Sequence, residues 1–301
     1  MKKIFVTGSH GLIGSRFVEL KKDDYQMLTP EIDTLDLTKS KEVVNYLNSN
    51  KPDAIVHFAA YTNVGEAELQ RDNRQGLCWK INVDATKTLS VWAGKEKRHF
   101  VHISTDMIFP GSSLTPGPYG EKDTRHEVSK NLTWYGYTKL EAEKVVNEYT
   151  ASSAILRLTY PVRAKFASKL DYIRKPIQLY DEKKLYPLFT DQIVSITYID
   201  EACQVISALI DASVKGIYHA CSVDRTTPHE LYTYVLKKTR NKDVNLSTTS
   251  IDEFLLKTDS PVRYPKYGGL KVEETQKALG MKFRTWKQIV EDMILQGLGE
   301  N

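Results

Sequence analysis

Three regularly spaced glycines, Gly8, Gly11 and Gly14, constrain this chain more than any other feature of its sequence. They follow a short apolar run at residues 3–7 and lead into residues 12–21, which have the apolar spacing of a helix. In a strand–turn–helix unit, the first glycine permits the tight turn, the second lets the backbone approach a pyrophosphate, and the third lets the helix pack closely. The helix N-terminus then offers N–H groups to the phosphates. The turn therefore predicts a nicotinamide dinucleotide site, with G-x-x-G-x-x-G spacing; the alternative is a turn that binds no ligand.

Apolar segments with strand and helix character alternate along the first half of the chain. Further strands are predicted at residues 25–29, 54–58, 100–103 and 154–158, and further helices at residues 40–48, 77–95 and 134–149. Strands that are apolar on both faces and alternate with helices are typical of a doubly wound parallel sheet. We therefore expect an α/β protein whose residues 1–160 form a Rossmann-type dinucleotide-binding domain.

The alternation weakens after residue 160. Residues 161–301 are expected to form a smaller substrate-binding α/β region, with the chain crossing between the two parts. Strands are predicted there at residues 185–190 and 216–220, and helices at residues 200–211, 228–238, 271–279 and 285–296. The polar stretch at residues 109–133, rich in Pro and Gly, is predicted to be a functional loop because ordinary connections are much shorter.

Charge and cysteine content restrict the partners and the compartment. The 42 Lys and Arg residues exceed the 38 Asp and Glu residues by four, and both signs are spread along the chain. This distribution argues against nucleic acid binding and is compatible with a small anionic ligand. No segment is long and apolar enough to cross a membrane. Three widely separated cysteines, Cys78, Cys203 and Cys221, indicate reduced thiols and hence a cytoplasmic protein.

An acidic residue after the second strand would bind the adenosine ribose of a dinucleotide. Glu31 is best placed for this role, and Asp33 and Asp36 are rivals. A carboxylate at this position repels a 2′-phosphate, so the expected cofactor is NAD(H) or NADP(H), with NAD favoured. The alternative is that Glu31 is an ordinary surface acid in a loop.

Tyr135 and Lys139 lie four residues apart in a predicted helix and therefore on one face, one turn apart. A nearby ammonium favours the phenolate, so we expect Lys139 to lower the pKa of Tyr135 and make it a general acid or base near neutral pH. Thr105, at the end of a predicted buried strand, could hydrogen-bond the same substrate oxygen. The alternative is an ordinary helix with a solvated lysine.

Further motifs follow in a recognisable order. They are Leu35-Asp36-Leu37-Thr38, Pro52-Asp53-Ala54-Ile55-Val56 with Ala59-Ala60-Tyr61-Thr62-Asn63-Val64, Ser104-Thr105-Asp106-Met107-Ile108-Phe109-Pro110-Gly111, Pro118-Tyr119-Gly120-Glu121-Lys122-Asp123, and Thr190-Asp191-Gln192. With the glycine turn and the Tyr–Lys pair, the set resembles the extended short-chain dehydrogenase/reductase superfamily and, within it, the dTDP-4-dehydrorhamnose reductase family. The resemblance covers nearly the whole chain, densely to about Arg157 and thinly after it.

The resemblance implies an NAD(P)H-dependent oxidoreductase that transfers hydride to the C4 ketone of a nucleotide sugar. It implies a catalytic triad of Thr105, Tyr135 and Lys139, with Tyr135 as the general acid. The implied cofactor-binding residues are Gly8, His10, Gly11, Leu12, Ile13, Gly14, Glu31, Asp36, Leu37, Ala59, Ala60, Tyr61, Ser104, Tyr135, Lys139 and Tyr160. The implied substrate-binding residues are Thr105, Asp106, Met107, Phe109, Tyr160, Lys165 and Arg263.

The chain departs from the family pattern mainly where the sugar should bind. Met107 replaces a Tyr, Tyr160 replaces a Trp, and Lys165 replaces an Asn of the family motifs. We therefore expect a related nucleotide-sugar reductase whose sugar differs from dehydrorhamnose. The assembly is compatible with a homodimer.

Two other functions remain open from the sequence. The first is a nucleotide-sugar 4-epimerase of the same superfamily, and the second is a non-catalytic subunit resembling the regulatory subunit of methionine adenosyltransferase. His57 and His102 lie in apolar strands and are predicted to be hydrogen-bonded core residues rather than catalytic ones. The sequence has no metal-binding motif, so no metal site is expected.

Overall fold

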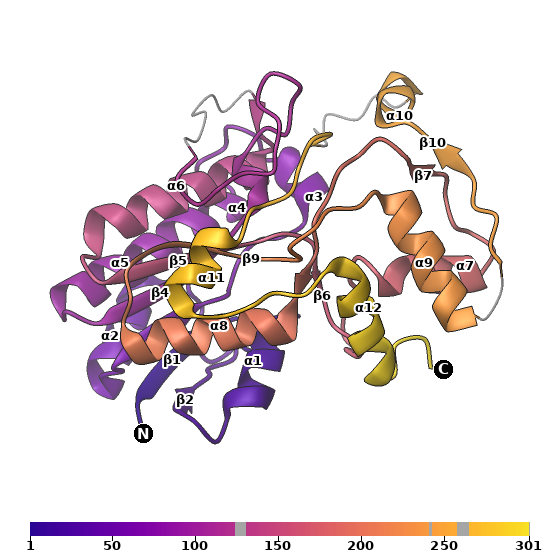
Figure 1. The fold of residues 1–301 in the computed structure, drawn as a ribbon. Helices are drawn as coiled ribbons and strands as arrows, with labels where there is room; N and C mark the ends of the chain where they lie inside the picture. Colours follow the sequence, from indigo (N-terminus) through magenta and orange to yellow (C-terminus); the bar gives the residue numbers. More distant parts are fainter. Residues whose placement is uncertain (124–130, 241–242, 258–264, 301) are drawn as a thin grey trace. The chain divides into compact units, whose positions relative to one another are not determined.

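The computed structural model describes residues 1–123, 131–240, 243–257 and 265–300 (Figure 1). The chain forms two compact units and passes between them several times. The first unit comprises Met1–Ile108, Arg125–Arg157 and Cys203–Tyr218, and the second comprises Phe109–Thr124, Leu158–Ala202 and His219–Asn301. The chain leaves the sheet-forming unit at Arg157, close to the boundary expected at residue 160, and residues 203–218 return to that unit.

A six-stranded sheet forms the centre of the first unit. Its order is β2(Gln26–Leu28), β1(Lys3–Thr7), β3(Ala54–His57), β4(His99–Thr105), β5(Ser153–Leu158) and β9(Gly216–Ala220). β1 pairs in parallel with both β2 and β3, and β3 pairs in parallel with β4. β2 lies on one side of β1, while β3, β4 and β5 follow in chain order on the other side. The direction of winding therefore reverses at β1, so the sheet is doubly wound, and the predicted Rossmann-type α/β fold is confirmed.

Helices cover both faces of this sheet. α2(Ser40–Asn50), α5(Thr86–Lys95) and α6(Trp134–Tyr149) lie on one face, and α1(Gly14–Lys21) lies on the other with α8(Ile199–Ala212) (Figure 1). Phe5, Val43, Leu89 and Val146 belong to the core under the first three helices. The helix predicted at residues 77–95 is a continuous helical stretch of α4(Leu77–Trp79), the π-helical segment η1(Lys80–Ala85) and α5.

Among its described residues, the second unit contains two small parallel pairs of strands and five helices of its own. The strand pairs are β6(Pro161–Val162) with β8(Thr197–Tyr198), and β7(Leu188–Phe189) with β10(Thr248–Thr249). The helices are α7(Arg174–Asp181), α9(Pro228–Arg240), α10(Ile251–Lys257), α11(Glu273–Leu279) and α12(Trp286–Leu295). Helix α7 is not predicted from the sequence. Pro176 is tolerated because it lies in the first turn, where backbone N–H groups have no intrahelical acceptor.

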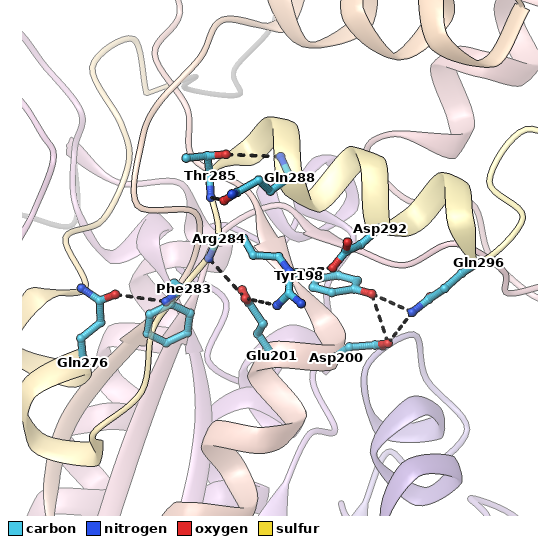
Figure 2. A network of polar contacts seen from close by, with 10 residues as sticks. All are labelled: Tyr198, Asp200, Glu201, Gln276, Phe283, Arg284, Thr285, Gln288, Asp292 and Gln296. Atoms are coloured by element: carbon cyan, nitrogen blue, oxygen red, sulfur yellow. Dashed lines mark hydrogen bonds and ion pairs between the residues drawn. The ribbon is translucent and has the colours of Figure 1, made fainter.

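A network of polar contacts attaches α12 to β8 and the start of α8 (Figure 2). The Arg284 guanidinium lies 2.7 Å from a Glu201 oxygen and 2.6 Å from an Asp292 oxygen. At the other end of α12, the Gln296 amide donates to Tyr198 Oη at 2.7 Å and to Asp200 Oδ2 at 3.0 Å. These contacts fix both ends of α12 within the second unit.

Candidate active site

The glycine turn between β1 and α1 has the backbone that its sequence predicts. Gly8 has a φ of +66°, and a Cβ there would lie 2.7 Å from the Ala59 nitrogen. A Cβ at Gly14 would strike the Gly8 carbonyl oxygen, so Gly14 lets α1 begin directly against the turn. The N-cap residue of α1, Ile13, makes no side-chain cap, as expected for a helix N-terminus that receives a ligand.

A cavity of about 520 Å³ lies along this turn within the first unit. Glu31 Oε1 lies 3.6 Å from His10 Nε2, so the acid after β2 faces the turn across the cavity. The Asp36 carboxylate accepts hydrogen bonds from the backbone and hydroxyl of Thr38, which lower its pKa. The predicted cofactor residues that line the cavity are Gly8, His10, Gly11, Glu31, Asp36, Leu37, Ala59 and Ala60.

The proposed catalytic residues come from two neighbouring elements of the first unit. Thr105 ends β4, while Tyr135 and Lys139 lie one turn apart on α6. The Thr105 hydroxyl donates to Asp106 Oδ1 at 3.2 Å and accepts from the Met107 N–H at 3.2 Å. The Thr105 hydroxyl also lies near enough to the Tyr135 phenol to act on its pKa, which it lowers. The two hydroxyl groups of Thr105 and Tyr135 and the amino group of Lys139 therefore all lie on β4 and α6 of the first unit.

The acidity expected for Tyr135 is wrong for this structure. Burial, followed by the nearby charge of Asp106, raises the pKa of the Tyr135 phenol, and the Thr105 hydroxyl only partly opposes this effect. Burial also lowers the pKa of Lys139 to about 8. Removal from water, which the helical spacing does not reveal, is the largest cause of the raised pKa of Tyr135, and Lys139 is not among the groups that act on it.

The start of α6 is held by two hydrogen bonds and one close backbone approach. The Thr133 hydroxyl accepts from the Gly136 N–H at 3.0 Å, and the buried Glu68 carboxylate accepts from the Trp134 N–H at 2.8 Å. A Cβ at Gly136 would strike the Met107 carbonyl oxygen, so glycine lets α6 pack directly on the 3₁₀ turn η2(Asp106–Ile108). Glu68 belongs to the short helix α3(Val64–Glu68), which the sequence does not predict.

A buried ion pair joins α6 to β5. The Arg157 guanidinium donates to both oxygens of Glu143, each at 2.9 Å, and both side chains are inaccessible to solvent. The Ser104 hydroxyl donates to the same carboxylate at 2.6 Å. Ser104, predicted to contact the cofactor, thus directs its hydroxyl proton to Glu143, one turn after Lys139.

Asn82, in the π-helical segment, links the loop beside the first cavity to α6. Its Oδ1 accepts from the Tyr61 N–H at 2.7 Å, and its Nδ2 donates to the Thr138 hydroxyl at 2.9 Å. Tyr61 follows the cavity-lining Ala59 and Ala60, and its own hydroxyl donates to Glu66. The contact places Tyr61 in the loop beside the cavity, with its ring hydroxyl turned toward α3.

A second cavity, of about 500 Å³, lies within the second unit and is lined mainly by aromatic side chains. The predicted residue Tyr160 lines it, with a φ of +40°, and its ring lies 4.2 Å from that of Tyr172. Phe109 is instead buried and stacked on Tyr119, and the Lys165 ammonium lies 3.0 Å from Glu300. Arg263 lies outside the described residues.

The structure also bears on the predictions made for the cysteines, for membrane-spanning helices and for metal ligands. Cys78, Cys203 and Cys221 are buried and form no disulfide. No helix among the described residues is long and apolar enough to cross a membrane. Within the same residues, no three His, Cys, Asp or Glu side chains are grouped as a metal site would require.

Comparisons with known proteins extend over the whole chain. The sequence profile of the family described as the RmlD substrate binding domain matches residues 1–298. The chain is 24% identical to a dTDP-4-dehydrorhamnose reductase of Aggregatibacter actinomycetemcomitans over 97% of this chain and 98% of the relative. It is 26% identical to a probable low-salt glycan biosynthesis reductase of Haloferax volcanii over 92% of each chain. The crystal structure of a dTDP-4-dehydrorhamnose reductase from Bacillus anthracis in complex with NADP superposes with a TM-score of 0.85, at 25% identity over 98% of this chain and 99% of that chain.

Proposed function

The chain belongs to the RmlD substrate binding domain family, and from this premise we propose that it is an NAD(P)H-dependent reductase of a 4-keto nucleotide sugar. The observation that carries the proposal is the grouping of Thr105, Tyr135 and Lys139 at the end of β4 and the start of α6. A nucleotide-binding protein without catalysis needs no half-buried phenol near a hydroxyl with a buried ammonium one turn away.

The first unit fits a dinucleotide. The backbone of the glycine turn leaves no room for side chains at Gly8 or Gly14, and the cavity beside it is of ligand size. In our proposal, the turn and the N-terminus of α1 hold the pyrophosphate, Glu31 holds the adenosine ribose, and Asp36 with Leu37 borders the adenine. Lys139 holds the nicotinamide ribose. When bound, the reduced nicotinamide supplies the hydride.

The reductive direction needs a phenol that carries its proton when the substrate arrives, and an ordinary phenol, with a pKa of about 10, does so at neutral pH. Burial raises the pKa of Tyr135 further, so the proton is present but is given up less readily than by a solvated phenol. As hydride adds to the C4 carbon, the carbonyl π bond breaks and Tyr135 gives its proton to the developing alkoxide. The Thr105 hydroxyl orients that oxygen. The Lys139 ammonium stabilises the phenolate left behind, which regains a proton from solvent.

The aromatic cavity of the second unit supports binding of the nucleotide portion of the substrate. Tyr160, Tyr172 and Phe189 offer planar faces for a base, and Gln192 offers an amide for its polar edge. The relatives named dTDP-4-dehydrorhamnose reductase identify the class of compound. Met107, Tyr160 and Lys165 depart from the family pattern, so we propose a sugar other than dehydrorhamnose as the preferred substrate.

We place this reaction in the cytoplasm, which agrees with three buried cysteines that form no disulfide. A homodimer stays a prediction that light scattering of the purified protein would test.

The function is tested with a panel of 4-keto nucleotide sugars and either NADH or NADPH, following loss of the reduced-nicotinamide absorbance. We expect oxidation that depends on the sugar nucleotide and falls by at least about a hundredfold in Tyr135→Phe. Equal rates with dTDP-4-dehydrorhamnose and every other sugar would contradict a shifted specificity. If NAD stays bound through dialysis and no net oxidation of reduced cofactor is seen, the result would favour 4-epimerisation over reduction.

A further inference from the structure

His102 is a buried ionisable residue that the proposed reaction does not use. It lies on β4, two residues before Ser104, and its side chain has no solvent exposure. The pairing of β3 with β4 places His57 directly opposite, and the two rings are 5.5 Å apart. The role of these two histidines depends on which ring nitrogen of each one carries the proton.

His57 is the hydrogen-bonded core residue that the sequence predicts. Its Nε2 lies 2.9 Å from the Thr86 hydroxyl, which gives its own proton to the Asn82 carbonyl and must therefore accept from Nε2. Its Nδ1 lies 2.7 Å from the Thr7 hydroxyl and accepts from it. Both nitrogens are thus satisfied in the neutral ring, and burial lowers the pKa of His57 to about 3.

His102 differs from His57 because its polar contact is with the proposed catalytic machinery. Its Nε2 lies 3.1 Å from Lys139 Nζ, and Lys139 is only 2% exposed. Among the described residues, Nδ1 of His102 has no hydrogen-bond partner. A buried polar atom without a partner destabilises the fold, so a histidine here is poorly explained as simple core packing. Within the described part of the chain, the polar contact of its ring is with the amino group of Lys139.

The direction of that hydrogen bond follows from the chemistry of the two groups. An ammonium can only donate, so Nε2 of His102 must accept and its ring proton must lie on Nδ1. Burial, then the Lys139 charge, then His57 keeps the pKa of His102 well below its ordinary value, which agrees with a neutral ring. The other groups that act on Lys139 are Glu143 on α6 and Cys78 on α4, and both raise its pKa against the effect of burial.

We propose that His102 is a positioning residue, whose Nε2 accepts from the Lys139 ammonium and fixes where that charged group lies on α6. The inference deepens the proposed function, because it gives β4 a second role besides presenting Thr105. A neutral acceptor such as His102 orients the Lys139 ammonium and leaves its positive charge in place. A carboxylate in the same position would neutralise that charge.

The tautomer provides a test in the unaltered protein. Long-range ¹H–¹⁵N NMR of the histidine rings in the cofactor-free full chain should show His102 with an unprotonated Nε2 and a proton on Nδ1. His57 should show the opposite tautomer. A proton on His102 Nε2, or a doubly protonated ring at pH 7, would overturn the proposal even if every variant failed to fold.

Two substitutions test the positioning itself. His102→Phe removes the acceptor, whereas His102→Gln can return an acceptor oxygen near the same place. The pKa of Lys139 is read from lysine labelled with ¹³C at Cε, with the signal assigned by its loss in Lys139→Met. We expect His102→Phe to lower this pKa by about one pH unit, because a hydrogen bond to a charged group is lost. His102→Gln should restore most of it.

Cofactor affinity supplies the second readout. Starting from a pKa of about 8, a fall of about one pH unit lowers the charged fraction of Lys139 at pH 8 from about one half to about one tenth. The Kd of NADPH at pH 8 should therefore rise up to about fivefold in His102→Phe and recover in His102→Gln. The matched control is His99→Phe. His99 is on the same strand and is 5% exposed, its Nε2 has no partner among the residues that the structure describes, and its Nδ1 bonds Ser152 rather than Lys139.

The outcomes separate the two proposals. An unchanged Lys139 pKa and NADPH affinity in His102→Phe, or equal effects in His99→Phe, would make His102 a packing residue only. A His102→Gln variant that behaves like His102→Phe would also overturn the acceptor role. If the proposed function is wrong, no nucleotide sugar will be turned over. The tautomer, the Lys139 pKa and the NADPH affinity are all measured without turnover, so they test the role of His102 separately.

Discussion

Replacing Arg157 with methionine removes the cation from the buried ion pair that joins α6 to β5. Glu143 then loses two hydrogen bonds of 2.9 Å and keeps the Ser104 hydroxyl at 2.6 Å. Neither Glu143 nor Arg157 is exposed, so water cannot replace the lost donors. Breaking a buried pair in this way costs about 3–5 kcal/mol. The remaining Ser104 bond and the nearby Lys139 charge place the expected loss near the lower end, at about 3 kcal/mol.

Urea unfolding followed by tryptophan fluorescence measures this loss. Trp79, Trp92 and Trp134 belong to the first unit and Trp286 to the second, so a Trp286→Phe background reports the first unit alone. The control is Arg98→Met, which breaks a pair with Asp53 whose side chains are 35% and 49% exposed and which should cost no more than about 1 kcal/mol.

The double variant Glu143→Leu/Arg157→Met shows whether the cost comes from the unpaired charge. With no charge left in the core, it should recover at least half of the stability that Arg157→Met loses. A loss below about 1 kcal/mol in Arg157→Met, or a double variant less stable than the single one, would refute the reasoning.

Further outcomes follow from the same geometry. Gly136→Ala should lower the free energy of unfolding in urea by about 1–3 kcal/mol and lower kcat, because its Cβ would meet the Met107 carbonyl. The control Gly65→Ala in α3 should be neutral or stabilising, because its Cβ would meet only a side-chain oxygen at 3.7 Å. The pKa of Lys139 is lowered from 10.5 to about 8, so the unfolded chain binds more protons than the folded one between these pH values. The free energy of unfolding should therefore increase as pH rises through that window, and this increase should vanish in Lys139→Met. Reductase kcat/KM should fall as pH rises through about 8, since Lys139 loses its charge, and a profile flat to pH 9.5 would contradict that role. Glu31→Ala should improve NADPH binding relative to NADH by about tenfold in fluorescence titrations, through lost repulsion of the 2′-phosphate, while Asp33→Ala, outside the cavity lining, should change neither.

Features set by local sequence could be predicted well. The glycine turn requires a positive φ at Gly8 and close packing at Gly14, and both needs are visible in residue type and spacing. The Tyr135–Lys139 spacing places both residues on one face of α6 in the same way. The alternating apolar segments likewise predict the doubly wound sheet, because strands buried on both faces leave a continuous apolar signal.

Features set by contacts between distant segments could not be predicted. Glu68 binds the start of α6, and Arg157 binds Glu143, through pairings that no local pattern reveals. Burial reverses the expected shift of the Tyr135 pKa because solvent exclusion depends on the whole fold. The predicted core residue His102 is buried as expected, but its contact with Lys139 arises only when β4 and α6 pack together.

The most direct test of the proposed reductase is a single-turnover measurement with NADPH and a panel of 4-keto nucleotide sugars, comparing the unaltered chain with Tyr135→Phe. The proposal predicts sugar-dependent loss of NADPH absorbance with reduction at C4, and a large fall in rate in Tyr135→Phe while NADPH binding persists. Absence of oxidation with every 4-keto sugar, or an equal rate in Tyr135→Phe, would contradict the proposal that this chain reduces a nucleotide sugar through Tyr135.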